Sequence, residues 1–186
     1  MVQVDCSFHD KHLESSIRDF VAKLPTERLE TVDKDEEPAA QLNSSQFKFV
    51  GLDSLRPFGP FFTFCPNGSR VVQFDLVNDK PLVLIGSFPG EEGKRHEVES
   101  KAFLVRFTAQ FEVEGTGKDV KLHSRVNMPV SMAGLSFRIK GLDEKSDEVV
   151  EKIAASLQPR FLQDLWHGML FSELEVLFTE ILEKGK

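Results

Sequence analysis

Hydrophobic and polar residues alternate along two neighbouring segments in the middle of the chain. Within residues 102–114, one side is apolar and the other is charged or polar. The apolar side consists of Phe103, Val105, Phe107, Ala109, Phe111 and Val113. In residues 120–128, the positions expected to face the same way are Val120, Leu122, Val126 and Met128. A period of two is typical of strands with one buried face, so the pattern predicts a pair of strands.

A tight turn at residues 117–118 is predicted to join these strands, with glycine supplying the positive φ that such a turn needs. This register places Glu114 opposite Lys121 and Glu112 opposite His123, so that charges match across the strands. A slip of one residue would put apolar side chains opposite polar ones. The pattern therefore favours this register or the one two residues away.

Further strands are predicted on both sides of the pair, and the first is a short strand near residues 2–8. The others are expected at residues 61–65, 70–77, 82–88 and 135–140. The turn at residues 66–68 contains proline and glycine, which favour a short hairpin loop. The run 82–85 at the start of the fourth of these segments is continuously apolar, which indicates a central strand covered on both faces.

Helical spacing appears at the two ends of the chain. Apolar residues recur at helical spacing from Asp10, which can cap a helix, to Pro25, which stops it. A second short helical turn is predicted at residues 26–32, and the acidic stretch 33–43 reads as an exposed connection. Near the C-terminus, helices are predicted at residues 146–157 and 160–183. The apolar positions of the last helix span more than the stripe of roughly 100° that covers a sheet, so we expect it to be buried on two sides.

The element order predicts a single α+β domain over residues 1–186. Residues 1–45 hold the short strand, the helix and the acidic connection. Residues 46–141 form an antiparallel meander of six or seven strands, and residues 142–186 form a long helical segment packed on the sheet. This order resembles the helix-grip topology of the START and birch-pollen-allergen-like proteins. That resemblance implies a curved sheet that wraps the last helix around an apolar cavity.

Composition excludes several classes of function. The chain has 23 Lys plus Arg and 30 Asp plus Glu, and its net charge of −7 argues against nucleic-acid binding. The start of the chain lacks a signal peptide's basic and apolar regions, and no apolar run approaches about 18 residues. Two cysteines are too few to staple a secreted domain. We therefore expect a cytoplasmic protein without a transmembrane segment, with reduced, inert thiols at Cys6 and Cys65.

The residues that carry catalysis or bind cofactors do not gather in recognisable patterns. Cys6, His9 and His12 resemble metal ligands, but no fourth ligand lies near them in sequence. The sequence has neither a nucleophile elbow nor a phosphate-binding glycine pattern. The outward residues near His123 are interpreted as a ladder of surface ion pairs rather than an acid/base site. We therefore expect no catalytic residues, no metal and no cofactor, and we classify the chain as not an enzyme. The remaining alternative is an active site that only the fold assembles.

The surplus of apolar residues near the C-terminus leads to two functional hypotheses. The first is a non-catalytic protein-interaction module or complex subunit, which binds a protein partner or a second copy through Phe171, Val176 and Phe178. The alternative is a carrier of a hydrophobic small molecule or lipid between the sheet and the last helix. The residues expected to line that cavity are Phe103, Phe107, Phe111, Phe137, Leu165, Trp166 and Met169.

Overall fold

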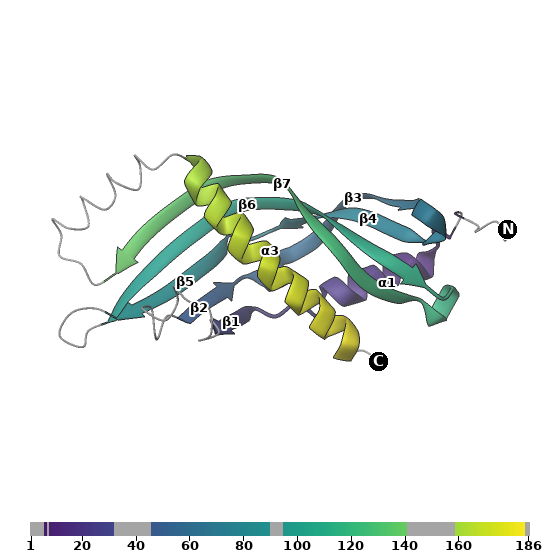
Figure 1. The fold of residues 1–186 in the computed structure, drawn as a ribbon, viewed down its shortest axis with the longest axis horizontal. Coiled ribbons are helices and arrows are strands. Elements are labelled where there is room, and N and C mark those ends of the chain that lie inside the picture. The colour runs from purple at the N-terminus through teal and green to yellow at the C-terminus, as the bar shows by residue number, and fades with distance from the viewer. Residues whose placement is uncertain (1–5, 7, 32–45, 90–94, 141–158, 185–186) are drawn as a thin grey trace.

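A computed structural model describes residues 6, 8–31, 46–89, 95–140 and 159–184, and it has the predicted α+β fold (Figure 1). An antiparallel sheet of seven strands carries a short N-terminal helix and a long C-terminal helix. The helices are α1 (Lys11–Val21) and α3 (Pro159–Lys184). The strands are β1 (Glu27–Thr31), β2 (Gln46–Val50), β3 (Leu55–Phe64), β4 (Val71–Asn78), β5 (Leu82–Pro89), β6 (Arg95–Glu114) and β7 (Lys121–Lys140).

The seven strands lie in five rows side by side across the sheet, which we call ribbons, because two of the rows each consist of two strands end to end. β6 pairs along one edge with β7, and along its other edge with β5 over its first half and with β4 over its second half. β4 and β5 follow each other in the chain and run the same way beside β6, so together they act as one interrupted ribbon. β2 and β3 make a second interrupted ribbon beside β5 and β4, and β1 adds an edge to β2.

The two interrupted ribbons are broken at the same level of the sheet, and we call the line through these breaks the crease. The residues on this line are Ser54, Asn78, Phe103 and Gly134. Asn78 is buried at its centre, where its side-chain oxygen accepts a hydrogen bond from the backbone N–H of Val105 at 2.7 Å. Its side-chain nitrogen donates to the carbonyl oxygens of Lys80 and Phe103. The amide of Asn78 thus satisfies backbone groups that the interrupted ladders leave unpaired.

The crease also changes which side of β6 faces the core. Ala102 and Val105 are both buried, so two residues lie between neighbouring inward-facing positions here, where a regular strand has one. Phe103 is therefore turned outward, with 60% of its surface exposed. The prediction that Phe103 shares a face with Phe107 and Phe111 is therefore wrong. Gly134 has a φ of 65°, and a Cβ there would lie 2.8 Å from the Cβ of Phe103, so a glycine makes room for the ring.

The turn between β6 and β7 has the predicted register. Glu114 lies opposite Lys121 and Glu112 opposite His123. Register shifts then occur near Gln110 and near Arg106, and each leaves one extra residue on β7. These shifts turn Val126 and Met128 to the exposed face, contrary to the prediction that they point inward. β7 also continues without interruption to Lys140, so the last predicted strand is its final part.

Residues 26–31, the described part of the segment 26–32, do not form the predicted helical turn. Residues Glu27–Thr31 are strand β1, which pairs with all five residues of β2. Pairing with a strand distant in sequence outweighs the local preference of so short a segment. The predicted strand at residues 2–8, the acidic connection 33–43 and the helix at 146–157 lie, wholly or for most of their length, outside the described residues.

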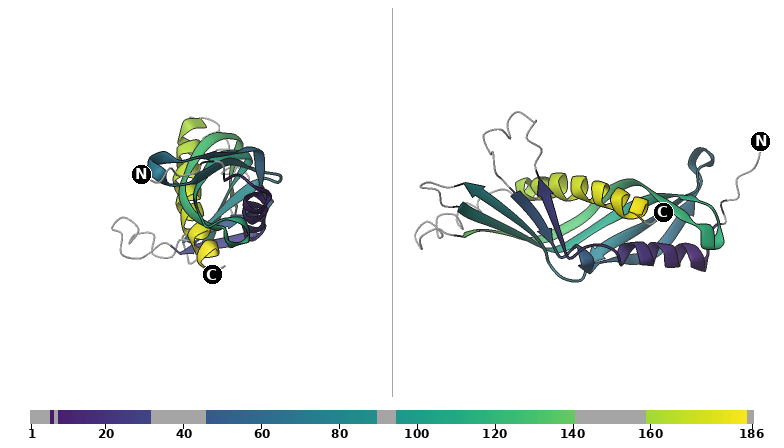
Figure 2. Two further views of the ribbon diagram at one scale, coloured as in Figure 1. Left: turned by 90° about the vertical axis from the view of Figure 1, so that its right-hand side faces the viewer. Right: turned by 90° about the horizontal axis from the view of Figure 1, so that it is seen from below.

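Both helices pack on the concave face of the curved sheet, and Figure 2 shows this curvature in a view along the long axis. Asp10 caps α1 through a 2.8 Å hydrogen bond from the backbone N–H of Leu13. Phe20 on α1 meets Phe178 on α3 and Phe111 on β6, with ring centroids 5.0 and 5.3 Å apart. Such edge-to-face pairs add about 0.5–1.5 kcal/mol each beyond the burial of their surface. This aromatic cluster joins the two helices to the sheet.

Polar contacts fix the position of α3. The indole N–H of the fully buried Trp166 donates to the hydroxyl of Ser100 at 2.8 Å, and that hydroxyl donates to the carbonyl of Ser136. Arg28 on β1 donates to Glu173 at 2.5 Å and to both carboxylate oxygens of Glu180. Hydrogen bonds to these carboxylates raise the pKa of Arg28 above its usual range, and Arg28 lowers the pKa of Glu180.

Candidate functional site

The predicted interaction flank of α3 is only partly at the surface. Phe178 is fully buried, and its ring stacks on Phe111 at 5.9 Å. Phe171 is half-buried and packs edge-on against Phe107 at 5.4 Å. Val176 is 49% exposed and is therefore the one of the three that faces solvent. The chain's own sheet thus covers most of the flank that the sequence analysis assigned to a partner.

The residues predicted to line an internal cavity are also packed against the fold itself. Phe107, Phe111 and Trp166 are fully buried, and Phe111 stacks on Phe74 with a centroid distance of 5.6 Å. Phe137 and Met169 are half-buried. Phe103 lies on the opposite face, and the side chain of Leu165 is outside the described part of the structure. Phe107, Phe111, Trp166 and Met169 therefore take part in the hydrophobic core.

The cysteines differ from the prediction of reduced, inert thiols. Cys6 and Cys65 form a disulfide with a Cα–Cα distance of 5.8 Å, and Cys6 is exposed. The bond ties the segment before α1 to the end of β3, so Cys6 takes no part in a site with His9 and His12. The premise of reduced thiols thus does not hold in this structure, and the cytoplasmic location stays a prediction.

The histidines that meet carboxylates lie at the surface. His9 contacts Glu14 at 2.8 Å, and His123 contacts Glu114 at 3.3 Å, with all four side chains exposed by more than a third. The second pair belongs to the predicted cross-strand ladder. Among the described residues, no three His, Cys, Asp or Glu side chains are grouped so that they could hold a metal ion.

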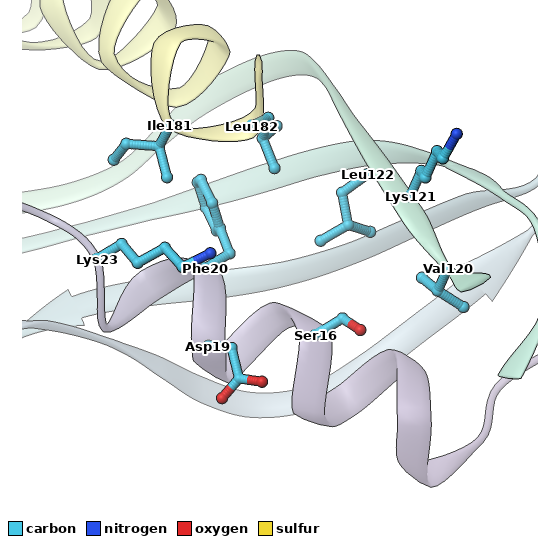
Figure 3. Close-up of a pocket in the computed structure, with 9 residues that line it drawn as sticks. All are labelled: Ser16, Asp19, Phe20, Lys23, Val120, Lys121, Leu122, Ile181 and Leu182. Carbon is cyan, nitrogen blue, oxygen red and sulfur yellow. The ribbon is translucent and has the colours of Figure 1, made fainter. Parts of the chain in front are cut away.

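A cleft opens where three elements meet, and we call it the α1–α3 cleft. It lies between α1, the first residues of β7 and the last turn of α3, and its volume is about 460 Å³ (Figure 3). Its apolar lining residues are Phe20, Val120, Leu122, Ile181 and Leu182. Its polar lining residues are Ser16, Asp19, Lys23 and Lys121. The cleft is open to solvent, so a ligand can reach it without unfolding any element.

Each element places its part of the cleft for a local reason. Phe20 is on the apolar stripe of α1 and is held by the aromatic cluster. Leu122 points inward because the turn register places it opposite Val113 on the concave face of the sheet. α3 runs one turn past Phe178, so Ile181 and Leu182 extend beyond the fully packed core and are only half-buried. An apolar surface therefore remains partly uncovered at the end of α3.

A second cleft of about 420 Å³ adjoins the first on the other side of Ile181. Lys23 and Ile181 line both clefts. The remaining lining residues of the second cleft are Pro25, Arg28, Leu177, Glu180 and Lys184. The two clefts together follow the C-terminal ends of α1 and α3.

The sequence analysis missed this site. It placed Ile181 and Leu182 in the over-wide apolar surface of the last helix, and Leu122 on the inward face of its strand. No pattern in the sequence indicated that these positions and Phe20 meet, because they come from three distant segments. The one available signal was the excess of apolar residues in the final turns of α3.

None of the described helices combines the length and apolar character needed to cross a membrane. The chain matches no known protein family, and no curated protein is significantly similar to it in sequence.

Proposed function

We propose that this protein is a non-catalytic binding protein that holds a hydrophobic small molecule in the α1–α3 cleft. The observation that supports this most strongly is the convergence of five apolar side chains from three elements on an open cleft of about 460 Å³. Small-molecule sites usually measure roughly 300–1,000 Å³ and combine apolar walls with a few polar groups. The α1–α3 cleft has this size, and five of its nine lining residues are apolar.

The degree of burial separates this cleft from the core. Trp166 and Phe111 are fully enclosed, whereas Ile181 and Leu182 retain accessible surface that a ligand would remove from water. Burying apolar surface contributes about 25 cal/mol per Å², so covering these side chains favours binding. The proposed site is therefore the end of α3 and not the Phe-rich interior.

Binding of the neutral dye Nile red to the full chain tests this proposal. Leu182→Gln is expected to weaken binding about tenfold, because loss of part of a leucine's apolar contact costs about 1.4 kcal/mol. Val176→Gln is the matched control, since Val176 is on the same helix but outside the cleft. Absence of saturable binding, or equal weakening by both substitutions, would contradict the proposal.

A second candidate function, protein interaction, is favoured by apolar side chains on the outer face of the sheet. The exposed residues of this patch are Phe58, Phe62 and Phe64 on β3, and Val126 and Met128 on β7. Polar pairs separate the two strands, such as Gln110 with Gln73 at 2.8 Å. The occupant that we test is a second copy of the chain. Light scattering during size-exclusion chromatography would show a dimer that Phe62→Ser disrupts, whereas a monomer at all concentrations would exclude self-association.

A further inference from the structure

We infer that the ligand of the α1–α3 cleft is a single-chain amphiphile with an anionic headgroup that lies beside Lys23. This inference rests on the proposed function and adds the chemical class of the ligand. The apolar tail would lie against Phe20, Leu122 and Leu182, and the headgroup would lie where the two clefts meet. Lys23 is at this junction because it lines both clefts.

The charges around the two clefts are complementary to an anion. Their lining residues include four cations and two anions, which gives a net +2 in a chain whose total charge is −7. The cations are Lys23, Arg28, Lys121 and Lys184, and the anions are Asp19 and Glu180. Glu173, which accepts a hydrogen bond from Arg28, reduces this excess to +1 when it is counted with them.

Not all of these cations are available to a ligand. Arg28 is held by Glu173 and Glu180, and Lys184 lies 3.6 Å from Glu180. Lys23 and Lys121 have no ion-pair partner within the described residues. Figure 3 shows the side chain of Lys23 extending toward Phe20, whereas the amino group of Lys121 points away from the other lining residues. Lys23 is thus the cation placed to meet a headgroup.

Two features oppose an anion at this position. α1 and α3 both end here, and each helix C-terminus carries about half a negative charge. Asp19 adds a full charge, but Figure 3 shows its carboxylate directed away from Leu182 and Leu122. Glu173 offsets one of the cations through Arg28, and the helix ends add about one negative charge, so the surroundings as a whole are close to neutral. The preference for an anion therefore depends on Lys23 itself, whose charge has no partner among the described residues. We therefore expect a modest preference for an anion and not a strong one.

Matched twelve-carbon ligands separate the headgroup from the tail. Titration calorimetry on the full chain would compare dodecanoate and dodecyltrimethylammonium, below their micelle concentrations, with dodecanol, below its solubility limit. Dodecanoate is expected to bind about fivefold more tightly than dodecanol, since a solvent-exposed ion pair contributes up to about that factor. Dodecyltrimethylammonium is expected to bind most weakly. Raising the ionic strength should reduce the preference for dodecanoate, because salt screens exposed charges.

Two lysine variants assign the preference to a residue. Lys23→Met keeps most of the apolar stem and removes the charge, so dodecanoate and dodecanol should bind this variant with equal affinity. Lys11→Met is the control, because Lys11 is an exposed residue of α1 that does not line the cleft. It should retain the fivefold preference.

The possible results distinguish this inference from the proposed function. Equal binding of dodecanoate and dodecanol to the unmodified chain, or tightest binding of the cation, would overturn the anionic headgroup. A preference that survives Lys23→Met would overturn the role of Lys23. In each of these cases the tail still binds, so the proposed function stands. If none of the three ligands binds, the proposed function itself fails.

Discussion

Replacing Arg28 with methionine is expected to destabilise the fold more than its position on an edge strand suggests. Arg28 connects β1 to α3, two elements that are far apart in the sequence. Its guanidinium contacts Glu173, whose side chain is only 6% exposed. Methionine retains the apolar stem of the side chain, so the loss reports mainly on the charge. The variant leaves the Glu173 carboxylate buried without its cation.

The magnitude follows from this burial. Removing one partner of a buried ion pair costs about 3–5 kcal/mol, because the other charge stays desolvated. Arg28 itself is 26% exposed, so water can reach part of the site and reduce the cost. We expect Arg28→Met to lower the free energy of unfolding by about 2–3 kcal/mol, a large part of the stability of a typical domain.

Urea denaturation at neutral pH, followed by the fluorescence of Trp166, measures this loss. A second variant, Arg28→Met with Glu173→Gln, removes the stranded charge as well. We expect it to recover at least about 1 kcal/mol relative to Arg28→Met alone. If the double variant is no more stable than the single one, an unpaired Glu173 is not the cause and the reasoning is refuted.

The pH dependence provides an independent check. Arg28 lowers the pKa of Glu180 below its ordinary value of 4.5, so the folded state holds this carboxylate deprotonated more readily than the unfolded state. The resulting stabilisation is present above pH 4.5 and is lost as the pH falls through the lowered pKa. The difference between the original chain and Arg28→Met should therefore shrink in acid. A constant difference from pH 7 to pH 3 would contradict this.

Three further substitutions probe the core, the crease and the disulfide by urea denaturation. Phe111→Ala should cost about 3–5 kcal/mol because it opens a cavity among packed rings, while Phe62→Ala, at a position that is 57% exposed, should change stability by less than about 0.5 kcal/mol. Gly134→Ala should destabilise more than Gly59→Ala, since both glycines have positive φ but only the first new methyl group meets another side chain; equal losses would show that the contact is unimportant. Cys6→Ser should lower stability by about 2–4 kcal/mol, as loss of a bridge spanning 59 residues predicts, and a reducing agent should remove the difference from the original chain.

The fold was predictable where two independent signals agreed. Alternation and turn chemistry favoured the register that places Glu114 opposite Lys121, or the one two residues away, and the structure has the first of these. The last helix was expected at residues 160–183 and spans Pro159–Lys184. The sequence did not predict the secondary structure of a segment whose conformation depends on pairing with a distant strand. The segment Glu27–Thr31 has no alternating apolar pattern and is a strand because β2 pairs with it.

The site was less predictable than the fold for a geometric reason. Phe103 continued the apolar alternation of its neighbours, and only the irregularity at the crease turns it outward. Phe20, Leu122 and Ile181 each looked like ordinary core residues in sequence. Their convergence depends on where α3 ends relative to α1, a relation that local patterns do not encode. The disulfide was missed because the prediction relied on the small number of cysteines, whereas the bond depends on the fold bringing Cys6 and Cys65 together across 59 residues.

The crease divides the sheet into two plates, which the continuous strands β6 and β7 join. α1 packs on the plate that contains β3 and β4. α3 contacts both plates, through Trp166 and Ser100 on one and through Phe178 and Phe111 on the other. α3 therefore spans the crease and braces the two plates against each other from the concave side.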